Sequence, residues 1–229
     1  MGELREIWNG LDWSVLTDML FSVIPALVCI MIHEVSHGLA AYWMGDETAK
    51  RQGRLSLNPL RHIDPMGLVM LVIFRFGWAK PVNVDMRSFR NPKRGMALTA
   101  LAGPASNFLL AAFLMAVYGF FFTPLYLSGK TGNTVLDLLS RTIILSIGLG
   151  VFNMFPIPPL DGSKVLFSLL PDNMYYKLMQ YERYGMIIMV VLLMTGILST
   201  PLGKLTGQVI TAMSTYIAAP LAELGANIF

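Results

Sequence analysis

The chain has 229 residues, of which 55% are apolar and 14% are charged, whereas roughly 25% of the residues of a soluble globular protein are charged. This composition, with a mean hydropathy of +0.58, excludes an ordinary soluble domain and predicts a multi-pass α-helical membrane protein. The net charge of +3 is modest, but the basic residues are unevenly distributed along the chain.

The first predicted membrane span covers 14–44. Between 19 and 44 the only charged or imidazole side chains are His33, Glu34 and His37, and about 20 apolar residues are enough to cross a hydrocarbon core. The single cysteine of the chain lies in this span, so no internal disulfide is expected. The segment before it carries three carboxylates and one arginine, so we expect no cleavable signal peptide.

Two histidines of this span belong to the pattern His33-Glu34-Val35-Ser36-His37. Positions i and i+4 lie one turn apart on the same helix face, so both imidazoles can reach one metal ion. Glu34 stands beside them, where it can take a proton from a metal-bound water. Ionisable side chains within a membrane segment are costly and indicate a functional site. The alternative is a buried polar cluster that fixes helix packing.

A basic insert over 45–94 follows the first span. Loops rich in lysine and arginine stay on the cytoplasmic side, so we expect the insert and 161–183 inside the cell, and 128–141 outside. A nucleic-acid surface would also be basic, but any membrane protein of this topology shows the same bias. The insert holds ten of the seventeen basic residues, namely Lys50, Arg51, Arg54, Arg61, Arg75, Lys80, Arg87, Arg90, Lys93 and Arg94.

The insert is expected to be β-rich. Arg54–Leu57 alternates between polar and apolar residues, which is typical of a strand. The apolar stretch 66–76 and the alternating residues 80–84 predict a β-hairpin with strands of about eight residues. A segment of that length is too short to cross a membrane as a helix. The predicted fold therefore has about four to six membrane segments, with a small membrane-associated β-hairpin or sheet between the first two.

Later spans are predicted at 95–127, 134–160 and 184–203, because each contains an uncharged stretch of about membrane-crossing length. A weaker fifth stretch, 205–222, either spans the membrane or lies in its interface. The polar residues that weaken it are Gln208, Thr211, Ser214 and Thr215.

A third metal ligand is needed, because catalytic zinc usually has three protein ligands and a water. Asp161 is the strongest candidate, since it follows Pro156, Pro158 and Pro159, which end the third span. Non-helical backbone at membrane depth occurs only where it lines a cavity or is buried in protein, so this carboxylate can point inward. His62 in the basic insert is the alternative ligand.

Asn107 and Asn153 are polar side chains in otherwise apolar spans. One reading is that they form hydrogen bonds between helices. The other is that one or both donate to the oxyanion of a tetrahedral intermediate, or orient the substrate backbone.

The pattern Asn-x-x-Pro-x-Pro-x-x-Asp-Gly at 153–162, together with the earlier His-Glu-x-x-His, resembles the site-2 protease family of intramembrane metalloproteases. The resemblance covers most of the chain and is to the short members, without a PDZ or CBS module. Ser163 stands where a second glycine is expected. Further matching motifs are Gly53-Arg54-Leu55, Asn58-Pro59, His62-Ile63-Asp64-Pro65, Gly77-Trp78-Ala79-Lys80-Pro81-Val82 and Ala102-Gly103-Pro104-Ala105-Ser106-Asn107.

The resemblance implies one zinc ion per chain, held by His33, His37 and Asp161, with Glu34 as the catalytic base. It further implies a zinc metalloendopeptidase that cleaves in or near the transmembrane segments of membrane proteins. The expected partners are such a substrate and the lipid bilayer, with no nucleic acid. The expected location is a prokaryotic plasma membrane, with the site reached from the cytoplasm. The alternatives are a zinc-binding transporter and a catalytically silent scaffold.

Overall fold

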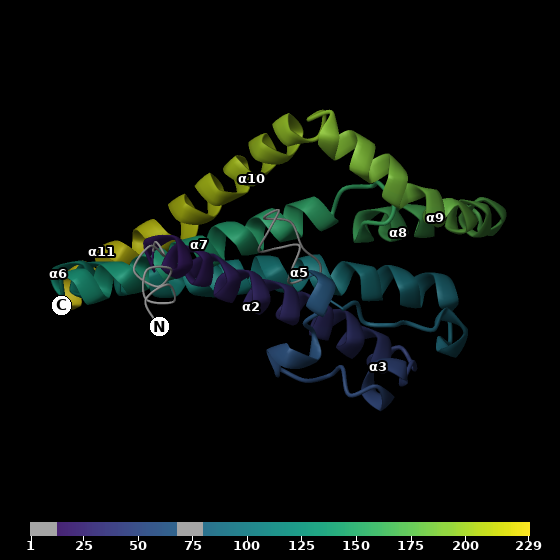
Figure 1. The fold of residues 1–229 in the computed structure, drawn as a ribbon, viewed down its shortest axis with the longest axis horizontal. Helices are drawn as coiled ribbons and strands as arrows, with labels where there is room; N and C mark the ends of the chain where they lie inside the picture. Colours follow the sequence, from purple (N-terminus) through teal and green to yellow (C-terminus); the bar gives the residue numbers. More distant parts are fainter. Residues whose placement is uncertain (1–12, 68–79) are drawn as a thin grey trace, which may run out of the picture.

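The structure is a computed structural model that describes residues 13–67 and 80–229 (Figure 1). Nearly all of the regular structure in these ranges is helical. The helices are α2 (Trp13–Trp43), α3 (Thr48–Arg51), α5 (Pro92–Phe120), α6 (Phe122–Leu127), α7 (Lys130–Asn153), α8 (Asp161–Ser168), α9 (Asp172–Met194), α10 (Ser199–Met213) and α11 (Ala219–Ile228). Two short turns, η1 (Pro59–Arg61) and η2 (Met86–Ser88), lie in the insert, and a π-helical turn, η3 (Ser214–Ala218), joins α10 to α11.

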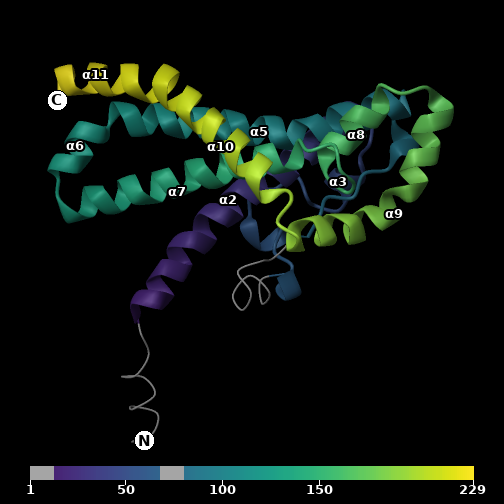
Figure 2. The ribbon, with the colours of Figure 1, turned by 90° about the horizontal axis from the view of Figure 1, so that it is seen from above.

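Helix α5 is the centre of the fold. It packs against α2, α7, α8 and α11, and the two views of the ribbon show α2, α5 and α7 side by side (Figures 1 and 2). The helix starts where the side chain of Asn91 accepts the N–H of Arg94, with Pro92 in the first turn, a favourable helix start. The core between α5 and α7 contains Ala111, Met115, Ile143, Ile147 and Val151.

Four helices of the described chain are long and apolar enough to cross a membrane. Large apolar side chains on their surface are exposed, as Leu109 and Phe113 of α5 are, which suits contact with lipid rather than water. The prediction of a multi-pass α-helical membrane protein is therefore confirmed. The four candidate spans are Phe21–Trp43, Pro92–Phe120, Lys130–Asn153 and Ser199–Ile228.

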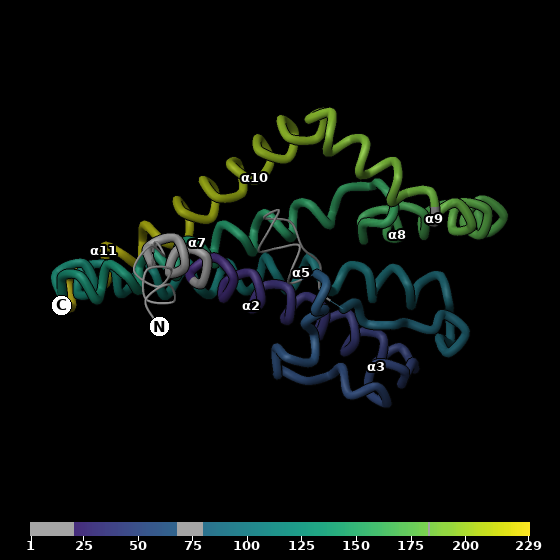
Figure 3. Tube along the Cα trace, viewed as in Figure 1, coloured from purple at the N-terminus to yellow at the C-terminus, as the bar shows by residue number. Residues whose placement is uncertain are grey.

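The last part of the chain differs from the prediction. The uncharged stretch 184–203 does not form one helix, because α9 ends at Met194 and α10 begins at Ser199 (Figure 3). Between them Gly196 has a φ of 70°, the left-handed conformation that commonly ends a helix. Residues 205–222 instead lie within the continuous helix formed by α10, η3 and α11.

The strand expected at Arg54–Leu57 is not found. The described residues contain no β-strand, only a single bridging position at Ile63. Polar groups of this segment pair within the insert rather than with a neighbouring strand. The guanidinium of Arg54 donates to the carbonyl of Arg61, and the ring Nε2 of His62 lies 2.8 Å from the carbonyl oxygen of Ser56. These contacts fold the segment back on itself.

The hairpin predicted over 66–84 falls mostly on 68–79, which lie outside the described residues. The segment 80–85 that follows is irregular, and two of its N–H groups bond to acidic side chains. The N–H of Val82 donates to Oε2 of Glu34 at 2.8 Å, and the N–H of Asp85 donates to Oδ2 of Asp46 at 2.7 Å. Side chains of α2 and of the loop after it therefore hold this segment in place.

Helix α5 leaves no room for a side chain at Gly119, where it meets the C-terminal helices. A β-carbon there would lie 2.9 Å from Cα of Ala218. We predict that Gly119→Ala lowers the free energy of unfolding by about 1–3 kcal/mol, because an added methyl overpacks a close contact. Thermal unfolding in detergent measures the change.

Gly148→Ala is the matched control for this substitution. Gly148 also lies in a membrane helix, but a β-carbon there would meet no atom within 4 Å. Alanine is the better helix former, so the control should unfold at the same temperature as the unmodified protein or slightly higher. An equal loss in both variants would contradict the packing at Gly119.

Candidate metal centre

Two imidazoles project from one face of α2. The rings of His33 and His37 are nearly perpendicular, at 89°, and their centroids lie 4.5 Å apart. Both side chains are buried. Their Nε2 atoms are 2.9 Å apart, so the two rings point at the same position beside the helix, as the spacing of four residues predicts.

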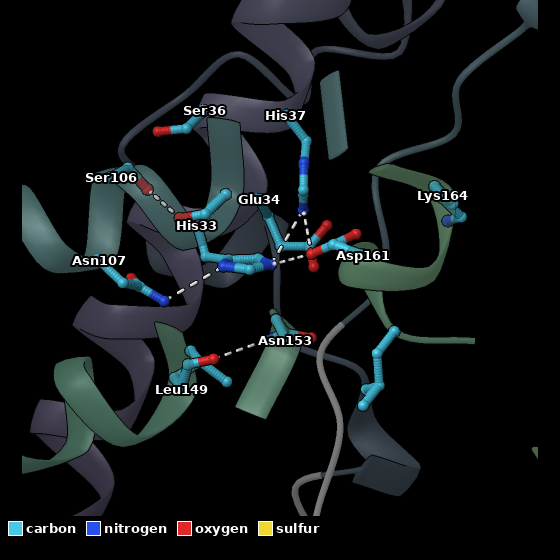
Figure 4. A network of polar contacts seen from close by, with 12 residues as sticks. His33, Glu34, Ser36, His37, Ser106, Asn107, Leu149, Asn153, Asp161 and Lys164 are labelled. Carbon is cyan, nitrogen blue, oxygen red and sulfur yellow. Dashed lines mark hydrogen bonds and ion pairs between the residues drawn. The ribbon is translucent and has the colours of Figure 1, made fainter. Parts of the chain in front are cut away.

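The third candidate ligand comes from the proline-rich segment after α7. That helix ends at Asn153, and the residues up to Leu160 form turns rather than helix, as the prolines predict. Asp161 is then the first residue of α8. Its Oδ2 lies 3.2 Å from Nε2 of His33 and 3.2 Å from Nε2 of His37 (Figure 4).

The ligand atoms of His33, His37 and Asp161 lie within 4.8 Å of one another, the one such cluster in the described chain. Two imidazole nitrogens and a carboxylate oxygen are ligand types found in catalytic zinc sites, where the fourth position is left to water or substrate. His62 is not part of the cluster, and its Nε2 faces the carbonyl of Ser56 instead. The geometry therefore favours Asp161 over His62.

The ring nitrogens that face away from the cluster, Nδ1 of His33 and Nδ1 of His37, contact α5. Nδ1 of His37 lies 2.7 Å from the carbonyl oxygen of Thr99. A carbonyl can only accept, so Nδ1 carries the hydrogen and the Nε2 lone pair is left for a metal. Nδ1 of His33 lies 3.1 Å from the side-chain amide of Asn107. The residues thus fit a zinc ion, since three ligand atoms converge and each ring is oriented from behind.

Helix α5 passes directly against the two rings at Gly103. A β-carbon there would lie 2.7 Å from Cε1 of His33, so a larger residue would separate the helices. Thr99 and Asn107 lie one turn before and one turn after Gly103 on the same face of α5. The close approach at this glycine therefore brings both of these residues to the imidazoles.

Glu34 lies beside the cluster without belonging to it. Its Oε2 accepts the N–H of Val82, and Figure 4 shows its side chain next to the three ligand side chains. Asn153 ends α7 close by, and its Nδ2 donates to the carbonyl of Leu149 at 3.0 Å. Ser163, at the position where a second glycine was expected, is buried, and its hydroxyl donates to the carbonyl of Leu160 at 2.7 Å.

Two residues at this site were missed by the sequence analysis, Thr99 and Val82. Each acts through a backbone group, a carbonyl in one case and an N–H in the other. Backbone groups are present at every position, so no residue type signals such a role. Val82 and Gly103 both belong to motifs that the sequence analysis had singled out, but the motifs alone gave neither residue a role.

Comparison with known proteins identifies the family. The family model described as Peptidase family M50 matches residues 21–196. The chain belongs to this family. YwhC of Bacillus subtilis, named provisionally as a zinc metalloprotease, is 39% identical over 192 residues, which are 81% of this chain and 83% of that protein. Rip2 of Mycolicibacterium smegmatis, named in the same way, is 32% identical over 177 residues, 76% of this chain and 66% of that protein.

No solved structure matches the chain. Membership of Peptidase family M50 confirms the resemblance to the site-2 proteases. Together with the apolar helices and the His-His-Asp cluster, it makes this protein a multi-pass intramembrane zinc metalloprotease. The zinc-binding transporter and the silent scaffold receive no support from the M50 relatives.

The purified M50 protease is expected to bind one zinc ion per chain. His33→Ala and Asp161→Ala should each lose most of the metal, because each removes one of three ligands, whereas His62→Ala should keep it. Elemental analysis of protein purified with limiting zinc measures the stoichiometry. Full occupancy in Asp161→Ala would show that the third ligand is a different residue.

Proposed function

We propose that Glu34 is the general base with which this protease hydrolyses peptide bonds in or near the transmembrane segments of its substrates. One observation carries the proposal: Glu34 lies beside the cluster of His33, His37 and Asp161 but is not a member of it. A closed structural zinc site has no open position for water, so a carboxylate beside it would have no water to deprotonate.

The proposed reaction needs a nucleophile, a base and a donor to the developing negative charge. When bound, zinc polarises the scissile carbonyl and lowers the pKa of its water from about 15.7 to about 7. Glu34 would accept a proton from the attacking water and would later deliver it to the departing amine. The bond from the Val82 N–H orients one carboxylate oxygen, which leaves the other to receive the proton.

Asn153 is the proposed donor to the oxyanion. It stands at the end of α7, directly before the segment that carries Asp161. Its amide donates to the carbonyl of Leu149, and rotation of the side chain would exchange that bond for one to the oxyanion. A donor aimed at the charge that develops in the transition state stabilises it strongly in a site with little water.

The proposed substrate is a transmembrane segment that unwinds locally, because the peptide bonds of an intact helix are protected by their own hydrogen bonds. The segment 80–85 lies next to Glu34 through the bond from Val82. Such a segment can hold a substrate strand through main-chain hydrogen bonds.

The proposed orientation places the basic insert on the cytoplasmic side of a prokaryotic plasma membrane, since loops rich in lysine and arginine are retained there. His33 and His37 lie in the half of α2 that leads into the insert. Water would therefore reach the zinc ligands from the cytoplasm.

Glu34→Gln tests the proposed base. The substitution keeps the size of the side chain and one acceptor oxygen but removes the proton acceptor, so zinc content and folding should be unchanged. Cleavage should fall by about 10²- to 10⁴-fold, and an uncleaved membrane substrate should accumulate with the variant. Near-normal cleavage of a co-expressed substrate by Glu34→Gln would show that another group is the base.

Cysteine labelling tests the proposed orientation. The native Cys29 is buried and gives little background. In intact cells a membrane-impermeant thiol reagent should label Asn133→Cys, in the segment expected outside, and spare Ser88→Cys in the insert; both positions are exposed in the structure. Labelling in the reverse pattern would overturn both the orientation and the cytoplasmic access of water.

A further inference from the structure

Asn107 lies on the opposite side of His33 from the other two candidate ligands. Its side chain is fully buried in α5, with Nδ2 3.1 Å from Nδ1 of His33. The ring of His33 separates it from the reaction centre, because the opposite nitrogen, Nε2, is the one that faces Asp161. Figure 4 shows the same order, with Asn107 on one side of the His33 ring and Asp161 on the other.

The hydrogen-bonding chemistry of this pair depends on which atom of the amide faces the ring. An imidazole that binds a metal through Nε2 carries its hydrogen on Nδ1. That hydrogen needs an acceptor, and the amide nitrogen of Asn107 offers only donors. The amide oxygen, Oδ1, is buried and has no hydrogen-bond partner among the residues that the structure describes.

Turning the amide over would correct the mismatch. The oxygen and nitrogen of an asparagine side chain are nearly the same size, so the amide can turn over within the same space. After the turn, Oδ1 accepts the Nδ1 hydrogen of His33, while its Nε2 lone pair faces Asp161 and His37. Asn107 then does for His33 what the Thr99 carbonyl does for His37.

We infer that Asn107 is a positioning residue that accepts the Nδ1 hydrogen of His33 through Oδ1, and so fixes the form of the ring that binds zinc. It is not a donor to the oxyanion, the role that the sequence analysis had left open. The inference rests on the proposed function of the site and concerns the affinity for zinc, which is measured without a substrate.

Asn107 is anchored well enough to orient a ring. Its backbone carbonyl accepts the hydroxyl of Ser146 from α7 at 2.8 Å. Asn107 therefore connects two helices to α5: its backbone carbonyl contacts α7, and its side chain contacts the candidate ligand His33 on α2. A partner that sets the orientation of a ligating histidine is typically worth about 10- to 100-fold in metal affinity.

The test is the zinc affinity of the purified protein in detergent, measured by competition with a chromophoric chelator. Asn107→Leu keeps the size of the side chain and removes the acceptor, so its affinity should fall by about 10- to 100-fold. Asn107→Asp keeps an acceptor, and a carboxylate behind a ligating histidine is a common arrangement; its affinity should stay within about threefold of wild type.

Ser106→Ala is the matched control. Ser106 neighbours Asn107 on α5, and its hydroxyl bonds only within that helix, to the carbonyl of Gly103, so zinc affinity should not change. If Asn107→Leu does not fold, the pair Asn107→Ala and Asn107→Asp gives the same comparison. An affinity for zinc in the apolar variants equal to wild type, or an equal loss in Asn107→Asp, would overturn the inference.

The oxyanion role predicts a different result. In that case both Asn107→Leu and Asn107→Asp would bind zinc normally and lose turnover, because neither would offer a donor to the intermediate. A failure of the proposed function would give another result. Glu34→Gln would then cleave its substrate at a near-normal rate, while the Asn107 variants would still show the zinc affinities expected here.

Discussion

The structure depends on one interaction, the contact of the Asp161 carboxylate, from α8, with two imidazoles from α2. A single helix face supplies only two ligands here, and a catalytic zinc site needs three. The third ligand is placed by ending α7 before a run of prolines and starting α8 at Asp161. Because α2 and α8 both pack on α5, the contacts of α5 set the distance between Asp161 and the histidines.

Helix α5 contributes no ligand, yet it determines how the ligands point. Thr99, Gly103 and Asn107 are spaced four residues apart on one of its faces: the first and last meet the outer nitrogens of His37 and His33, and the glycine allows the close approach. Inside a membrane each polar group left unpaired is expensive. The same contacts that satisfy the imidazoles therefore also orient them for a metal.

Sequence reasoning succeeded where composition or local pattern decides the outcome. The spans that became α2, α5 and α7, the paired histidines and the proline-ended helix before Asp161 all follow from short-range rules. The prediction of one span at 184–203 was wrong. No charged residue marks the break between α9 and α10, which occurs at Gly196, a glycine with a positive φ.

Contacts between distant residues could not be predicted in the same way. Thr99 and His37 are 62 residues apart in the chain, and Val82 and Glu34 are 48 apart. Each contact uses a backbone group, so its existence depends on tertiary packing rather than on residue type. The strand expected at Arg54–Leu57 failed for a related reason, since the ring of His62 meets the backbone carbonyl of Ser56, a group that a strand would have paired with a neighbour.

The insert contacts the proposed catalytic base as well as connecting two spans. Helix α2 fixes the backbone of Glu34, but a glutamate side chain retains about 1.5–2 kcal/mol of rotamer freedom unless something holds it. The N–H of Val82 supplies that restraint. Its segment is anchored separately by the buried carboxylate of Asp46, which accepts the N–H groups of both Thr48 and Asp85. The orientation of the proposed base thus depends on a segment outside the membrane helices, the same segment proposed to hold the substrate.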